Sequence, residues 1–122
     1  MKGFRRIYVH FLLPNLVKIL GGFEVSSLTQ EQIEKIGEIA EEAARRSLLK
    51  KVPISGVSDF TVSVSLDAKE VLNVEVDVEL TLSPMYKDVG ANKLADESAK
   101  AAFEAIENYL RKIGCQFNIS SL

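Results

Sequence analysis

The chain has few of the residues that most often carry chemistry or covalent cross-links. Its 122 residues include one cysteine, one histidine and no tryptophan. The single thiol, Cys115, has no partner for an internal disulfide, and one thiol with one imidazole is too few for a zinc site built from cysteine and histidine. The glycines form neither a dinucleotide-binding nor a P-loop pattern. We therefore expect no cofactor and no phosphate-binding loop.

Neither sign of charge dominates, since 15 basic residues stand against 17 acidic ones and the net charge is −2. Proteins that bind nucleic acid need lysine and arginine in number to contact phosphates, so nucleic acid is not a favoured partner. Long apolar runs are also missing. His10, Pro14, Asn15 and Lys18 interrupt the most apolar segment, and a bilayer span needs about 20 apolar residues. We expect no membrane span.

What remains is the composition of an ordinary globular domain, with 47% hydrophobic and 26% charged residues. The chain divides into three regions: an apolar N-terminal arm, a body with regular periodicity and a short tail. Their bounds are residues 1–25, 26–114 and 115–122.

Two segments of the body have the three- and four-residue apolar spacing of an amphipathic helix. The first begins at a capping box formed by Thr29 and Gln32 and ends before Pro53. The second follows Pro84 and ends near Gly114, a residue typical of helix C-termini. Both helices have opposite charges four residues apart, which favour the helical state.

Between the helices the apolar period changes to two, over residues 60–66 and 72–82. This pattern predicts a two-stranded hairpin. Both apolar sets have even numbers and must share one face, so the hairpin loop has three or five residues. We favour five, with Leu66 opposite Leu72, because a three-residue loop usually needs a left-handed residue and the segment has no glycine.

The order helix, strand, strand, helix predicts a two-layer α+β fold, with an antiparallel sheet based on the hairpin and both helices on one face. Two strands alone are marginally stable and leave two free edges. We expect a third strand from one of three sources: residues 6–11 of the arm, residues 116–119 of the tail, or a second copy of the chain. A homodimer is the favoured association.

The arm has several interpretations. A short amphipathic helix lying on the domain or on a neighbour is favoured over a signal peptide or a membrane span, and the arm is also a candidate strand. Its basic start is typical of a signal peptide, but the apolar core is interrupted and no small-residue cleavage site follows. Val25 is an alternative first residue of the protein, because Gly21-Gly22 can be encoded by a ribosome-binding site upstream of a GTG codon.

The predicted self-association interface consists of apolar residues on the second strand and in the arm. These residues are Leu72, Val74, Val76, Val78, Leu80, Leu82, Ile7, Phe11, Leu12, Leu16 and Ile19.

Three carboxylates, Glu75, Asp77 and Glu79, alternate along the polar face of the second strand. They are weak candidates for a metal site or for contact with a basic protein partner. Neighbours on one strand face lie about 7 Å apart, whereas a divalent cation needs several oxygens that converge on it. A solvated acidic face that keeps the sheet soluble is the favoured interpretation. His10 has no recognisable catalytic partner.

The segment from Val89 to Ala102, after helix and antiparallel strands, resembles a double-stranded-RNA-binding domain. That resemblance implies a basic cluster at the start of the second helix, but Asp96 and Glu97 occupy the region. An RNA-associated module is therefore an alternative function. A small divalent-metal-dependent enzyme that uses the acidic face is a second alternative.

The segments from Thr61 to Leu80 and from Lys87 to Leu110, with their Glu/Lys pairing, resemble a family of small archaeal proteins of unknown function. The resemblance covers about residues 27–113, implies an archaeal cytoplasmic protein, and identifies no site residues. Glu and Lys make up 22 of the 122 residues, a trend typical of hyperthermophiles. We predict a non-enzymatic interaction module that associates with itself.

Overall fold

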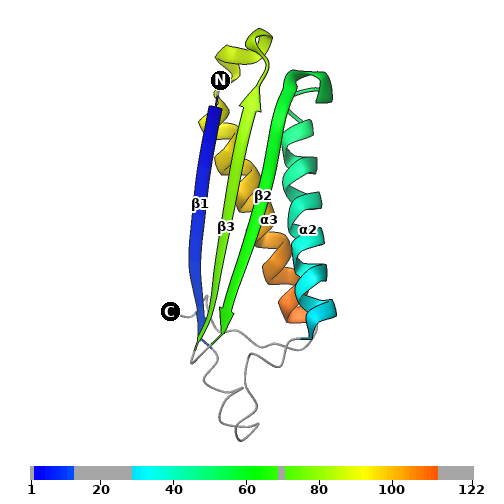
Figure 1. Ribbon diagram of the computed structural model, residues 1–122, viewed down its shortest axis with the longest axis vertical. Coiled ribbons are helices and arrows are strands. Elements are labelled where there is room, and N and C mark those ends of the chain that lie inside the picture. Colours follow the sequence, from blue (N-terminus) through cyan, green and yellow to red (C-terminus); the bar gives the residue numbers. More distant parts are fainter. Residues whose placement is uncertain (1, 13–28, 69–70, 113–122) are drawn as a thin grey trace, which may run out of the picture.

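The computed structural model describes residues 2–12, 29–68 and 71–112. In this part of the chain, two long helices cover one face of a three-stranded antiparallel sheet, and the other face is open (Figure 1). The predicted two-layer α+β fold is confirmed. The face of the sheet that lies away from the helices is called the open face below.

The central strand of the sheet is β3 (Val71–Leu82), with β2 (Val57–Ala68) on one side and β1 (Lys2–Leu12) on the other. The arm thus supplies the third strand, which was one of the three predicted sources. The prediction of an amphipathic helix is wrong for residues 2–12. The unpaired backbone groups along the edge of β3 explain the difference, because a strand satisfies them and a helix does not. The predicted source in the tail lies outside the described residues.

The register between β2 and β3 places Val62 opposite Val78 and Leu66 opposite Val74. The prediction that both apolar sets share one face is therefore confirmed. The five-residue loop is wrong, because Ala68 lies opposite Leu72 and only three residues separate them. The shorter loop extends the ladder toward the turn and so satisfies further backbone groups on both strands. A register shift at the start of β2 marks a bulge next to Asp59.

Helix α2 (Gln30–Leu49) begins where the sequence predicts. The Thr29 hydroxyl accepts a hydrogen bond from the Gln32 N–H at 3.0 Å, and the Gln32 side-chain oxygen accepts one from the Thr29 N–H at 3.0 Å. This reciprocal pair satisfies donors that the first turn leaves free. The side chains that α2 buries recur every four residues: Ile36, Ala40, Ala44 and Leu48.

Two short 3-10 helices, η2 (Ile54–Gly56) and η3 (Pro84–Val89), lead into β2 and α3 (Ala91–Lys112). Helix α3 and strand β3 together supply most of the buried core residues. The helix-side residues of β3 from Val74 to Leu82 are at most 1% exposed. Alanines dominate the buried stripe of α3, which lets this helix lie close to the sheet.

Candidate interaction surfaces

The open face carries the three predicted carboxylates in one row along β3. Glu75, Asp77 and Glu79 form this acidic row, and Glu79 is the most exposed of them. The neighbouring positions of β2 are the small polar residues Ser65, Ser63 and Thr61. The neighbouring positions of β1 are Tyr8, Arg6 and Phe4.

Arg6 of β1 neutralises part of the acidic row. Its guanidinium donates two hydrogen bonds to Asp77, at 2.8 and 3.0 Å, and lies 3.7 Å from Glu75. The hydrogen bond to Asp77 and the charges of both carboxylates raise the pKa of Arg6 above its ordinary value. The guanidinium also lies 5.7 Å from the centre of the exposed Phe4 ring. Analysis of the sequence missed Arg6, because only the register of β1 brings it opposite Asp77.

The acidic row does not converge on a metal position. In residues 2–12, 29–68 and 71–112, no group of three or more His, Cys, Asp or Glu side chains is arranged to hold a metal ion. The reason is geometric: side chains two apart on a strand point the same way in parallel, and Arg6 occupies both oxygens of Asp77. The acidic row therefore pairs with a cation of the same chain, the Arg6 guanidinium.

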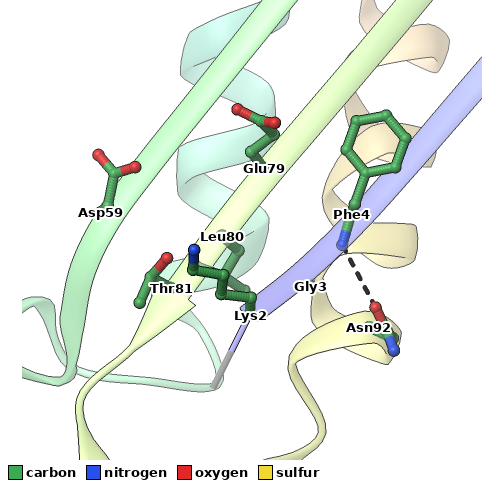
Figure 2. A pocket seen from close by; sticks show the side chains of 8 residues that line it. All are labelled: Lys2, Gly3, Phe4, Asp59, Glu79, Leu80, Thr81 and Asn92. Carbon is green, nitrogen blue, oxygen red and sulfur yellow. Dashed lines mark hydrogen bonds between the residues drawn. The ribbon is translucent and has the colours of Figure 1, made fainter.

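At one end of the open face lies a polar hollow (Figure 2). Asp59 and Glu79 line it from neighbouring strands, because Asp59 is paired with Thr81 and Glu79 with Thr61. Lys2 and Phe4 of β1 also line it. The hollow therefore contains both signs of charge beside an aromatic ring.

The edge of the sheet at β1 is tied to the start of α3. The Phe4 N–H donates to the Oδ1 atom of Asn92 at 3.2 Å (Figure 2). Gly3 lies against the helix so closely that a Cβ atom there would come within 2.2 Å of the Ala91 carbonyl oxygen. Glycine is the residue that permits this approach, because every other side chain begins with a Cβ.

A charge network continues this contact along β1. Arg5 lies 2.9 Å from a carboxylate oxygen of Asp96 in α3, and the other oxygen of Asp96 lies 3.1 Å from the Lys100 ammonium. Residues 2–6 include three cations: Lys2, Arg5 and Arg6. Charged residues on an edge strand oppose pairing with another strand, so the β1 edge is blunted along residues 2–6, whereas residues 7–12 have no Lys, Arg, Asp or Glu.

The edge at β2 is different, because residues 61–66 have no charged side chain. The helix-side residues of β2 are only partly buried, although their partners on β3 are at most 1% exposed. Beside them, Ile54 is 74% and Leu49 is 38% exposed, and a groove runs between the end of α2 and the start of β2. These incompletely covered apolar residues form the lateral strip, which consists of Leu49, Ile54, Val57, Phe60, Val62, Val64 and Leu66.

The predicted interface residues do not lie together on one surface. Five of them lie in the core beneath the helices, at most 1% exposed: Val74, Val76, Val78, Leu80 and Leu82. This placement corrects the expectation that they line an edge open to a second copy, because β3 is central and both of its edges are paired. Ile7 is partly buried against the same core.

The other predicted residues belong to strands or lie outside the description. Phe11 is paired with Leu72 and Leu12 with Val71 at the end of the β1–β3 ladder. Leu16, Ile19 and Cys115 lie outside the described residues. His10 is in β1, opposite Asn73. Among the described helices, none is long and apolar enough to cross a membrane.

Together the fold and its surfaces define a small two-layer α+β protein with an open polar sheet face and one incompletely covered edge. The chain belongs to the DUF3194 family of proteins of unknown function, whose family model matches residues 25–109. The matched range contains α2, the β2–β3 hairpin and most of α3, and it leaves β1 outside. The resemblance to small proteins of unknown function is thereby confirmed.

Relatives in two archaea are similar over the same length. The chain is 33% identical over 86 residues to the uncharacterized protein TK0644 of Thermococcus kodakarensis, and the match covers 70% of this chain and 79% of that protein. It is 30% identical over 86 residues to the uncharacterized protein PF0383 of Pyrococcus furiosus, and the match covers 70% of this chain and 77% of that protein.

Two solved structures share the fold. A crystal structure from Thermococcus onnurineus is 27% identical, with a TM-score of 0.63, and the match covers 93% of this chain and 95% of that chain. The solution structure of the hypothetical protein mth677 from Methanothermobacter thermautotrophicus is 21% identical, with a TM-score of 0.58. That match covers 72% of this chain and 94% of mth677 and shows the fold alone.

Proposed function

We propose that this protein is a non-enzymatic module that acts by binding, and that a second copy of the same chain is its main partner. The lateral strip carries the proposal. It joins the exposed side chains of Leu49 and Ile54 to the partly buried apolar side of β2. Contiguous apolar surface beside an uncharged strand edge is typical of association sites, because burying it removes apolar area from water and pairs free backbone groups.

The surroundings of the acidic row support a role without metal catalysis. Both oxygens of Asp77 accept hydrogen bonds from Arg6, and Glu75 lies near the same guanidinium. A divalent cation at this position would have to displace Arg6 and supply the energy of its hydrogen bonds. We therefore assign the acidic row a structural role in the sheet, in place of a role in catalysis.

The distribution of cations favours a protein partner over RNA. All five arginines of the sequence lie in ion pairs with carboxylates of the same chain: Arg5, Arg6, Arg45, Arg46 and Arg111. Phosphate binding requires cations that can release counterions from the nucleic acid, and paired arginines serve this poorly. The proposal also includes a cytoplasmic location.

Light scattering coupled to size exclusion, at several protein concentrations, tests the proposal. We expect a mass that corresponds to two chains and that falls toward one chain only on dilution. A mass of one chain at every concentration would contradict self-association. Retention of duplex RNA that weakens from low to high salt would support the RNA-associated alternative in its place.

A further inference from the structure

We propose that two copies of this chain join through their β2 strands, around a twofold axis that makes the neighbouring β2 strands antiparallel. The result is one continuous six-stranded sheet, with the helices of both copies on the same face. This inference rests on the proposed self-association and goes beyond it, because it names the edge, the orientation and the residues that meet.

The two edges of the sheet differ in how their backbone groups are protected. At β1, Asn92 accepts a hydrogen bond from the Phe4 N–H, and Arg5 is held by Asp96. At β2, the six residues from Thr61 to Leu66 have neither charge nor proline. Natural sheets protect exposed edges with charge, proline or covering side chains, and an edge without protection is the one that pairs.

The lateral strip lies along the same edge. Helix-side residues of an edge strand are more exposed than those of a central strand, because no further strand flanks them. Val62 and Val78 are opposite each other on one face, yet Val78 is 0% exposed and Val62 is only partly buried. A second β2 strand would place apolar residues of the partner beside Val62 and remove this difference.

Helix α2 runs antiparallel to β2 on the side of the open edge, and its charges are unevenly distributed along its length (Figure 1). Its first part is acidic and its end is basic, apart from Lys35. Glu41 and Glu42 are paired with Arg45 and Arg46 within the helix. The other charges outside these pairs are Glu31, Glu34 and Glu38 near the start of α2, and Lys50 and Lys51 just after its end. Antiparallel β2 strands bring the two α2 helices antiparallel, so the acidic part of each faces the basic end of the other.

A matched pair of charge substitutions on the two edges tests the assignment. Ser63→Lys places a cation at the middle of β2, where the twofold axis brings it near its own copy. Phe4→Lys makes the same change on β1, at a side chain that is 48% exposed on the same face. We expect Ser63→Lys to raise the dimer dissociation constant by about tenfold or more and Phe4→Lys to leave it unchanged. Light scattering over a dilution series measures both.

A second pair of substitutions changes residues outside the sheet. It still tests the β2 assignment if the Ser63→Lys variant does not fold. Ile54→Lys changes a lateral-strip side chain that is 74% exposed, and Met85→Lys changes one in η3 that is 87% exposed. We expect about a tenfold weaker dimer for Ile54→Lys and no change for Met85→Lys, with the same circular dichroism spectrum for both.

The outcomes separate this inference from the proposed function. A wild-type protein with the mass of one chain at every concentration overturns both. A wild-type dimer that dissociates with Phe4→Lys, and not with Ser63→Lys or Ile54→Lys, overturns the β2 assignment and leaves self-association intact. A dimer sensitive to Met85→Lys and insensitive to Ile54→Lys also overturns the assignment.

Discussion

At the β1 edge, the Asn92 side chain accepts a hydrogen bond from the Phe4 N–H, and Asp96 forms an ion pair with Arg5. At the β2 edge, residues 61–66 have no charged side chain, and their valines are only partly buried. Both edges belong to one three-stranded sheet. The difference arises from the helices, because the start of α3 lies against β1 and only α2 lies beside β2. A small sheet can thus have one edge finished within the chain and the other left for association.

The largest expected effect comes from separating β1 from α3. Gly3→Ala places a Cβ 2.2 Å from the Ala91 carbonyl oxygen, so strand or helix must move. We expect the free energy of unfolding to fall by about 1–3 kcal/mol, as for other overpacked sites. Urea denaturation measures it. Gly37→Ala is the matched control, where open space predicts a gain of up to about 1 kcal/mol at concentrations that keep the protein monomeric. Equal effects at the two glycines would contradict the close contact at β1.

A smaller effect is expected from Arg6→Ala, which removes the cation from the acidic row. The side chain is exposed, so solvent screens the loss, and we expect only a small decrease in the free energy of unfolding in denaturation experiments at low salt. The difference from the wild type should shrink at high salt. Arg111→Ala, which removes only a pair within α3 with Glu107, provides a comparison and should cost less. A larger loss for Arg111→Ala would show that Arg6 does not hold β1 to β3.

Asn92→Ala is expected to have a still smaller effect on stability, about 0.5 kcal/mol, because the higher helix propensity of alanine partly offsets the lost hydrogen bond to β1. The sharper readout is amide hydrogen exchange. The Phe4 N–H loses its acceptor, so its exchange should accelerate while the amides at the centre of β3 keep their rates. Unchanged exchange at Phe4 would mean that this edge is protected in another way.

The smallest expected effect is that of divalent cations on the wild type. Mg²⁺, Ca²⁺ and Mn²⁺ should leave the melting temperature unchanged, because Arg6 already occupies the oxygens of Asp77. Thermal denaturation with and without each cation measures this. A stabilisation that disappears with Glu75→Gln and Asp77→Asn would contradict it and favour the metal-dependent enzyme.

Local patterns predicted the elements well. The capping box at Thr29 gives the start of α2, and the even-numbered apolar residues give the face that the hairpin buries. Both signals depend on residues close together in sequence, where spacing alone fixes which side chains share a face. The predicted loop length was wrong. Turn chemistry favoured five residues, whereas a three-residue loop adds backbone hydrogen bonds to the ladder, and the structure has the shorter loop.

Long-range placement was harder to predict. The apolar residues of the arm suit a helix or a strand equally, and only the free edge of β3 selects the strand. The same uncertainty hid the ion pair between Arg6 and Asp77, which lie 71 residues apart in sequence. The sequence analysis also placed the interface on Val74 to Leu82, because it treated β3 as an edge. Once β1 covers that edge, β2 is the other outer strand of the described sheet, and its central residues 61–66 carry no charge.

Amide hydrogen exchange along the two edge strands, at a high and a low protein concentration, tests the central claim most directly. The β2 assignment predicts that amides between Thr61 and Leu66 which point away from β3 exchange slowly at high concentration and faster on dilution, while the outward amides of β1 exchange at the same rate in both samples. Protection that depends on concentration at β1 and not at β2 would contradict it, as would exchange independent of concentration at both strands.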